Sequence, residues 1–110
     1  MLFRSARFQN ANMTNASMVA ADLTNAVLTG ATLKSASFPN ADLEGATLTG
    51  AMLELAYMNS ASLKNADLTN ANLNKATYVG TRFKGAKWID GSVCQSPSIG
   101  TCRTGAAQHK

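Results

Sequence analysis

Residues 21–50 read ADLTNAVLTGATLKSASFPNADLEGATLTG, and an alanine opens every block of five. The same register holds for fifteen alanines, from Ala6 to Ala76. Two residues after each alanine lies a large apolar side chain. This second column runs from Phe3 to Val93, over nineteen positions that are all Leu, Phe, Met, Tyr, Trp or Val. A repeat this strict predicts a repeat architecture.

The five-residue period fits neither a helix nor a flat strand. An α-helix advances about 100° per residue, so a step of five would scatter the alanines around its axis. In a strand, side chains alternate between faces, so the odd step would turn every second alanine outward. The chain must therefore bend once per pentad. Residues that tolerate a positive φ recur two positions after the large apolar residue and mark these bends: Asn10, Asn15, Asn25, Gly30, Asn40, Gly45, Gly50, Asn65, Asn70, Gly80 and Gly85. This pattern predicts a solenoid.

The repeats resemble those of the pentapeptide-repeat family, whose motif is Ala, then Asp or Asn, then Leu, then two freer residues. The motif stands here as Ala21-Asp22-Leu23, Ala41-Asp42-Leu43, Ala66-Asp67-Leu68 and Ala71-Asn72-Leu73. The resemblance implies an all-β fold, a right-handed quadrilateral β-helix with four pentads per coil and about 4.5 coils. Residues twenty apart would then stack, which places Val93 above Leu73 in one inward column.

After Trp88 the repeat decays, and we expect three segments: a solenoid over residues 1–93, a capping segment over 94–102 and a disordered tail over 103–110. Cys94 and Cys102 flank a short loop. By the pairing usual in exported domains, we expect a disulfide that pins the cap. Two reduced structural thiols in a cytosolic protein are the alternative. Two cysteines and the lone His109 are too few ligands for zinc, so no metal is expected.

Composition indicates a non-enzymatic protein. The chain is one domain by length, without an apolar run long enough for a membrane span. The repeat is in phase from Phe3, so we expect no signal peptide. The six carboxylates fall mostly on outward positions, where no cleft would perturb their pKa values. We therefore expect no catalytic residues and no cofactor.

The net charge of +4 is concentrated towards the C-terminal end, where Lys64, Arg82, Lys84 and Lys87 gather. No aromatic platform interleaves with these cations, so we interpret them as a solvated face and do not expect nucleic acid as a partner. Some members of the family mimic DNA and protect topoisomerases. A cytoplasmic binder of such a nucleic-acid enzyme is the alternative function, which the positive charge disfavours. A threonine row through Thr29, Thr49 and Thr69 is too incomplete to favour ice binding.

One outward apolar cluster, Met52, Leu55 and Tyr57, is a candidate protein contact. We therefore expect a rigid rod that acts as a protein-interaction or structural module, with a protein partner of unknown identity. An uncapped solenoid end would also allow a homodimer. A Cys94–Cys102 bond would place the protein in the periplasm or outside a bacterial cell, and reduced thiols would place it in the cytoplasm.

Overall fold

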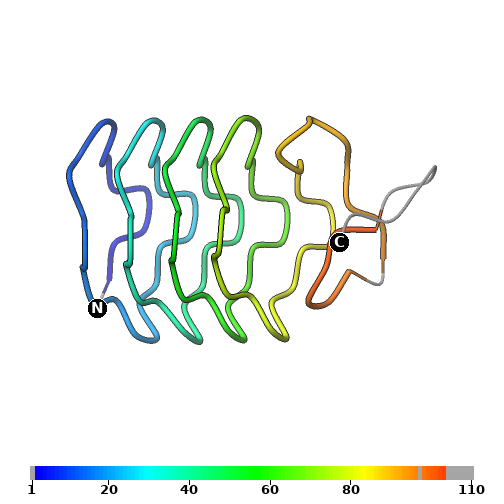
Figure 1. Cartoon of the computed structure of the whole chain (residues 1–110). Helices are drawn as coiled ribbons and strands as arrows, with labels where there is room; N and C mark the ends of the chain where they lie inside the picture. The colour runs from blue at the N-terminus through cyan, green and yellow to red at the C-terminus, as the bar shows by residue number, and fades with distance from the viewer. Residues whose placement is uncertain (1, 97, 104–110) are drawn as a thin grey trace.

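The computed structural model describes residues 2–96 and 98–103, and over these residues it contains no helix. The chain winds into coils that stack from the N-terminal to the C-terminal end (Figure 1). Isolated parallel β-bridges join residues twenty apart, from the pair Leu2 and Asp22 to the pair Asp67 and Lys87. Four pentads therefore complete one coil, as the resemblance implied, and the fold is a right-handed quadrilateral β-helix.

The outward second residues of the pentads form four rows, which we call the first to fourth faces. The first face carries Leu2, Asp22, Asp42, Ser62 and Arg82. The second face carries Arg7, Val27, Thr47, Asp67 and Lys87. The third face carries Asn12, Thr32, Met52 and Asn72. The fourth face carries Ser17, Ser37, Tyr57 and Thr77.

Each pentad ends in a left-handed corner. The angle φ lies between 56° and 76° at every fifth residue from Ser5 to Gly85, which confirms the predicted bends. Asn and Gly accept this conformation readily, but the stack also imposes it on Ala20, Leu55 and Lys75. An L-residue with a Cβ is strained there by about 1–2 kcal/mol, so the periodic fold overrides local preference at these corners.

The two apolar columns point inward, as predicted. From Ala21 to Ala66 no alanine of the column is more than 2% exposed, and from Leu23 to Leu68 no large residue is more than 1% exposed. Burying each large side chain contributes about 1.5–3 kcal/mol. The small column keeps the coils narrow enough for this packing, because a larger residue would force the neighbouring side chains from their rotamers.

The Asp or Asn at the second position of a pentad has a local structural role. Its Oδ1 accepts a hydrogen bond from the backbone N–H two residues later, at 2.9–3.2 Å for the pairs Asn12–Thr14, Asp22–Thr24, Asp42–Glu44, Asp67–Thr69 and Asn72–Asn74. No backbone carbonyl of the described residues accepts these N–H groups. A short acceptor side chain therefore satisfies a donor that the solenoid leaves over.

The predicted inward position of Val93 is wrong. The five-residue period predicts a corner at Asp90, but the residue with a positive φ is the next one, Gly91, at +85°. The chain reverses there, with the Trp88 N–H bonded to the carbonyl of Ser92 at 2.7 Å. Val93 then pairs antiparallel with Lys87 and is 52% exposed. The parallel stacking therefore ends at Lys87.

The returning chain lies over a cluster of aromatic rings. Ring centroids are 5.1 Å apart for Phe83 and Trp88, and 5.6 Å and 6.1 Å from Tyr78 to these two rings, all edge to face. A second antiparallel bridge joins Ile99 to Arg82. We call residues 92–96 and 98–103 the cap. Arg103, expected in the tail, accepts a 2.7 Å hydrogen bond from the Gln95 N–H and belongs to the cap. The rest of the expected tail, with His109, lies outside the described residues.

Candidate protein-binding surface

The predicted contact residues Met52, Leu55 and Tyr57 wrap the corner between the third and fourth faces. Their exposed fractions are 40%, 50% and 44%, so their predicted outward orientation is confirmed. The side-chain amide of Asn59 donates a hydrogen bond to the Tyr57 hydroxyl oxygen at 3.0 Å. We call these three residues the apolar corner. Its role as a contact remains a prediction.

Two features distinguish the apolar corner among the described residues. Leu55 adopts φ +60° while half of its side chain faces solvent, so a large apolar residue is kept where Gly or Asn would be less strained. Beside it, Glu54 Oε1 is buried without a hydrogen-bond partner, alone in this respect among the side chains of the described residues. Buried oxygens without a hydrogen-bond partner are rare, and either water or a bound partner can supply the donor.

The cap completes the β-ladder on the first and second faces. The N–H groups of Phe83 and Gly85 donate to the carbonyls of Ser98 and Cys94, at 2.8 and 2.7 Å. On the second face, the Cys94 N–H donates to the carbonyl of Ala86 at 2.8 Å. The cap therefore supplies the groups that another coil would have supplied on these two faces.

Within residues 2–96 and 98–103, no backbone group of the cap bonds to the third or fourth face, although a Cβ built on Gly100 of the cap would lie 3.5 Å from Gly80 N. In the coil below, Leu53 and Leu55 donate their N–H groups upward to the carbonyls of Asn72 and Asn74, at 2.8 and 3.0 Å. The equivalent N–H groups one coil higher belong to Leu73 and Lys75 on the third face and to Tyr78 and Gly80 on the fourth. They have no acceptor among the described residues, and the carbonyls of Ala71 and Ala76 have no donor there. We call residues 71–80 the open edge.

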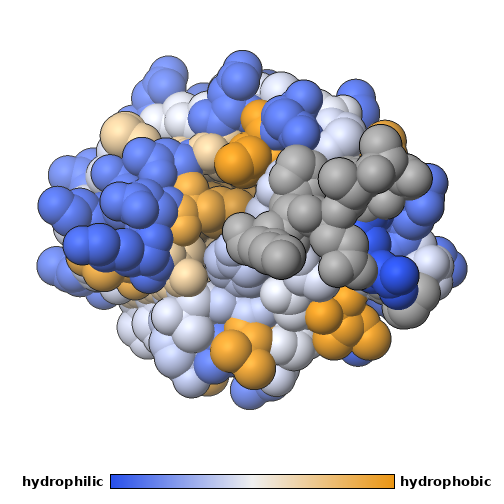
Figure 2. Space-filling view, turned by 45° about the vertical axis from the view of Figure 1, so that its right-hand side comes forward, coloured by the Kyte–Doolittle hydropathy of each residue, from blue (hydrophilic) through white to orange (hydrophobic). Residues whose placement is uncertain are grey.

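A hollow of about 430 Å³ lies at the open edge. Leu73, Tyr78, Trp88 and Ile89 give it an apolar side, and Asn72 and Asn74 line its rim. Figure 2 turns this end of the rod forward and shows apolar surface gathered between polar groups near the cap. Asn72 pairs with Met52 one coil below, so the hollow and the apolar corner lie on the same side of the rod.

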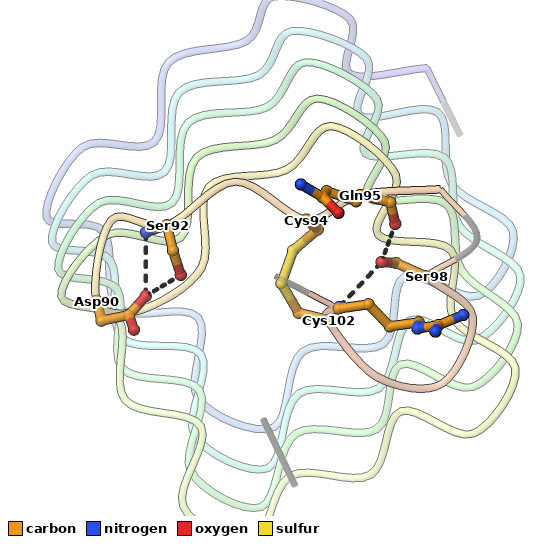
Figure 3. The surroundings of a disulfide bond; sticks show 7 residues. Asp90, Ser92, Cys94, Gln95, Ser98 and Cys102 are labelled. Carbon is orange, nitrogen blue, oxygen red and sulfur yellow. Dashed lines mark hydrogen bonds between the residues drawn. A yellow bond between two sulfur atoms is a disulfide. The ribbon is translucent and has the colours of Figure 1, made fainter. Parts of the chain in front are cut away.

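The cap is anchored by a disulfide between Cys94 and Cys102 (Figure 3). The two Cα atoms are 5.0 Å apart, and both side chains are buried. The intervening loop is tied further by Ser98, whose hydroxyl donates to the Gln95 carbonyl and accepts the Arg103 N–H at 3.0 Å. The pairing expected for an exported domain is therefore present in the structure.

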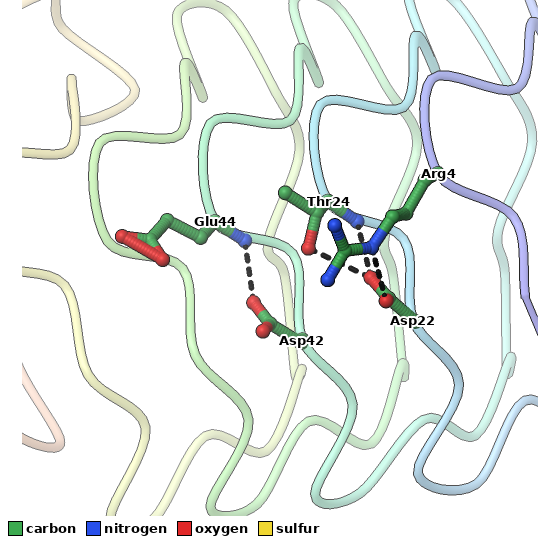
Figure 4. Close-up of polar contacts among 5 residues, drawn as sticks. All are labelled: Arg4, Asp22, Thr24, Asp42 and Glu44. Atoms are coloured by element: carbon green, nitrogen blue, oxygen red, sulfur yellow. Dashed lines mark hydrogen bonds and ion pairs between the residues drawn. The ribbon is translucent and has the colours of Figure 1, made fainter.

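The first face is acidic towards its N-terminal end. Arg4 Nε donates to Asp22 Oδ2 at 2.6 Å, and Thr24 donates to the same carboxylate through its hydroxyl at 2.7 Å (Figure 4). The Arg4 hydrogen bond, with a smaller effect of Thr24, lowers the pKa of Asp22 from 3.8 to about 2. Asp22, Asp42 and Glu44 are the acidic residues at this end. Because Asp22 is paired with Arg4, only Asp42 and Glu44 lack an ion pair within the described residues.

The same face is basic towards its C-terminal end. Lys64, Arg82 and Lys84 surround a hollow of about 230 Å³ that Ser96, Ser98 and Ile99 of the cap complete. In the described part of the chain these cations form no ion pair. The sequence predicted this grouping, and the structure adds that the cap forms one wall of it.

Residues 2–96 and 98–103 contain neither a candidate metal site nor a candidate membrane-spanning helix. In these ranges no group of three or more His, Cys, Asp or Glu side chains could hold a metal ion. The same ranges contain no helix with the length and apolarity needed to cross a membrane.

The open edge is the feature that the sequence did not predict. Its signal was the density of turn-forming residues after Trp88, which marks where the coil breaks off. With twenty residues per coil, a break after residue 88 leaves residues 71–88 without a successor coil, and the cap bonds only to those from residue 81 onward. The missing knowledge was which faces the returning chain would cover.

Comparison with known proteins shows relatives of the same architecture. The family model described as "Pentapeptide repeats" matches residues 2–38, 26–65 and 53–87. HetL, a pentapeptide repeat protein of Nostoc sp. strain PCC 7120 involved in heterocyst differentiation regulation, is 37% identical, with a TM-score of 0.82. The match covers 84% of this chain and 42% of HetL, so the chain spans less than half of that relative.

Two more solved structures are similar. The pentapeptide repeat protein alr5209 of Nostoc is 31% identical with a TM-score of 0.59, over 74% of this chain and 67% of alr5209. A pentapeptide repeat protein from the Arabidopsis thaliana thylakoid lumen is 21% identical with a TM-score of 0.51, over 92% of this chain and 79% of that one, and shows the fold alone. The search of curated protein sequences returned no match. From its repeats, its stacked coils and these matches, the chain belongs to the pentapeptide-repeat family.

Proposed function

We propose that this chain is a non-enzymatic protein-interaction module whose contact surface is the side formed by the third and fourth faces. The observation that carries the proposal is Leu55, a half-exposed leucine held at φ +60°. Together with Met52 and Tyr57 it forms an exposed apolar cluster, and such clusters mark contact sites. Exposed Met52 and Tyr57 and the unsatisfied Glu54 oxygen beside it support the same surface.

Site-specific crosslinking in the organism that makes the protein tests this proposal. A photoreactive p-benzoylphenylalanine in place of Tyr57 should form an adduct with one partner of defined mass. The control carries the same group in place of Arg82, an exposed residue on the first face, which lies opposite the third face. Met52→Lys should remove the adduct at Tyr57, because it places a charge in the apolar contact. Equal adducts at both positions, or no adduct at Tyr57, would contradict the proposal.

We also propose that the protein acts in an oxidising compartment, outside the cytoplasm. The buried Cys94–Cys102 disulfide supports this, since such bonds persist in secreted and periplasmic proteins and are rare in reducing compartments. Acid quenching of whole cells, followed by alkylation and mass measurement, tests it. The protein should take up two alkyl groups only after reduction. Uptake of two groups without reduction would place it in a reducing compartment.

The alternative, a topoisomerase-protecting DNA mimic, receives little support from the surface. A DNA mimic needs an extended acidic stripe, and Arg4 neutralises Asp22 at the N-terminal end of the acidic run. The same face is basic around Lys64, Arg82 and Lys84, which a DNA-binding groove would repel.

A further inference from the structure

Among the described residues, the C-terminal end of the solenoid is hydrogen-bonded to the cap on the first and second faces but not on the third and fourth. The cap satisfies Phe83 and Gly85, whereas the equivalent donors Leu73 and Lys75 on the third face have no acceptor in the described ranges. A β-edge with free donors and acceptors pairs readily with another strand. The question is therefore which strand this edge receives.

We propose that the open edge binds one extended peptide segment of a partner protein as an added parallel β-strand, with a large apolar side chain of that segment seated beside Trp88. This inference rests on the proposed function and names the form that the partner takes. The apolar corner lies one coil below the edge, through the bridge between Met52 and Asn72, so one partner can contact both.

The backbone of the open edge has the groups that a parallel strand requires. In every complete coil the large residue and the corner residue donate upward, and the alanine carbonyl accepts from above, as for Leu53, Leu55 and Ala51. Leu73, Lys75 and Ala71 repeat this arrangement one coil higher. A bound segment would therefore accept from two N–H groups and donate to one carbonyl on the third face. Main-chain bonds of this kind give strand addition its affinity.

The hollow selects the side chain. A residue stacked above Leu73, as Leu73 is stacked above Leu53, would enter the space lined by Leu73, Tyr78, Trp88 and Ile89. These walls are apolar and aromatic, so a large apolar residue gains from burial there. Asn72 and Asn74 at the rim are suited to the polar residues on either side of it in an alternating segment.

The cap argues against a second copy of this chain as the occupant. End-to-end stacking of two solenoids requires all four edges to pair at once. On the first and second faces the edge groups Phe83, Gly85 and Ala86 are already bonded to Ser98 and Cys94. A whole coil would collide with these cap residues, whereas a single segment along residues 71–75 of the third face avoids them.

Amide hydrogen exchange of the full chain tests the proposal directly. The probe is the acetylated and amidated peptide Ala-Asn-Leu-Asn-Lys-Ala-Thr-Tyr-Val-Gly, a copy of residues 71–80 that carries the repeat of the next coil. We expect its binding to slow exchange at the Leu73 and Lys75 amides by about tenfold or more. The control peptide is N-methylated at its second residue, which removes the donor to the Ala71 carbonyl, and should bind about tenfold more weakly.

Substitution of two isoleucines distinguishes binding in the hollow from binding elsewhere on the surface. Ile89 lines the hollow and Ile99 lies on the cap over the first face, and both are exposed, at 37% and 63%. Ile89→Glu should weaken peptide binding about tenfold or more, because it places a charge in the apolar site. Ile99→Glu should leave the affinity within about twofold, as expected for a surface change away from the contact.

Several outcomes would overturn the inference. These are no protection of Leu73 and Lys75 at saturating peptide, equal binding of the N-methylated peptide, or equal effects of the two isoleucine variants. Protection in the free chain that disappears when residues 104–110 are removed would make the chain's own end the occupant. Protection that grows with protein concentration, with a dimer in sedimentation, would make it a second copy. If the Tyr57 adduct forms although the peptide does not bind, the proposed function stands and this inference alone fails.

Discussion

The hydroxyl of Thr81 donates a 2.7 Å hydrogen bond to the backbone carbonyl of Met58, in the coil below it. Thr81 stands in the alanine column and is fully buried. The column therefore accepts a larger, polar residue where its one polar atom finds an acceptor.

Thr81→Val should destabilise the protein by about 1 kcal/mol, because it replaces the buried donor with a methyl group against a carbonyl oxygen. Urea unfolding gives the measurement. The control is Thr77→Val, an exposed threonine on the fourth face, which should change stability by no more than about 0.5 kcal/mol. Equal effects of the two substitutions would show that the Thr81 bond contributes nothing.

Gly45→Ala should cost more than Gly50→Ala. Both glycines have a positive φ, +71° and +66°, so both variants carry the left-handed strain of about 1–2 kcal/mol. A Cβ at Gly45 would also lie 2.2 Å from Asn25 Oδ1, while a Cβ at Gly50 meets nothing within 4 Å. Moving Asn25 off its rotamer adds about 0.5–1.5 kcal/mol. Thermal melts in an Asn25→Ala background should remove the difference. A difference that persists there would exclude Asn25 as its cause.

Leu55→Gly should change stability and partner binding in opposite directions. Glycine accepts φ +60° without strain, so we expect the melting temperature to hold or rise, with a gain of up to about 1 kcal/mol. Crosslinking from Tyr57 should fall, because the exposed apolar contact is lost. Ala20→Gly relieves the same strain at φ 56° on another coil and should leave crosslinking unchanged. Unchanged crosslinking in Leu55→Gly would remove Leu55 from the contact.

Arg4→Gln should raise the pKa of Asp22 from about 2 towards 3.8. Folding lowers this pKa, so the Arg4–Asp22 pair stabilises the folded protein above about pH 4 and loses its effect as the pH falls towards 2. The carboxyl carbon shift of Asp22 in an NMR titration measures the pKa. Asp67 serves as the internal control, because a hydrogen bond from Thr69, not from Arg4, lowers its pKa. An unmoved Asp22 pKa would make Thr24 the main cause.

Reduction of the Cys94–Cys102 bond should loosen the cap and leave the central coils folded. The bond closes a short loop, and such cross-links stabilise by about 2–4 kcal/mol. Exchange should therefore accelerate at the Phe83 and Gly85 amides, which donate to cap carbonyls, and stay slow at Leu43 and Leu48. Nearest-neighbour coupling in a solenoid confines the effect to the end. Global unfolding on reduction would show that the cap supports the whole stack.

The periodic part of the fold could be predicted from the sequence. The inward columns and the corners follow from the spacing of alanine, leucine and Asn or Gly. In a flat strand a five-residue step would turn every second alanine outward, so the chain must bend once per pentad. The stacking of residues twenty apart came from the family resemblance, and the pairs from Leu2 and Asp22 onwards confirm it.

The aperiodic end could not be predicted in the same way. Gly91, one position later than the period requires, turns the chain back, and Asp90 Oδ1 holds that turn through the Ser92 N–H at 3.0 Å. Val93 was therefore misplaced. The backbone groups of Cys94 are hydrogen-bonded to those of Gly85 and Ala86, and no repeat in the sequence marks this pairing. The open edge follows from where the returning chain lies, and the spacing of residues says nothing about that.

The coil of four pentads restricts how a gene for such a protein can change in length. Loss or duplication of twenty residues, for example residues 51–70, would preserve which faces the cap covers. Gain or loss of five residues would keep both apolar columns intact but rotate the end by a quarter of a turn relative to the coils below. Such a variant would fold with the same core and present its free strand edge on a different side. A change in the number of pentads can therefore change the side of the rod on which the free strand edge lies, while the core keeps the same residue types.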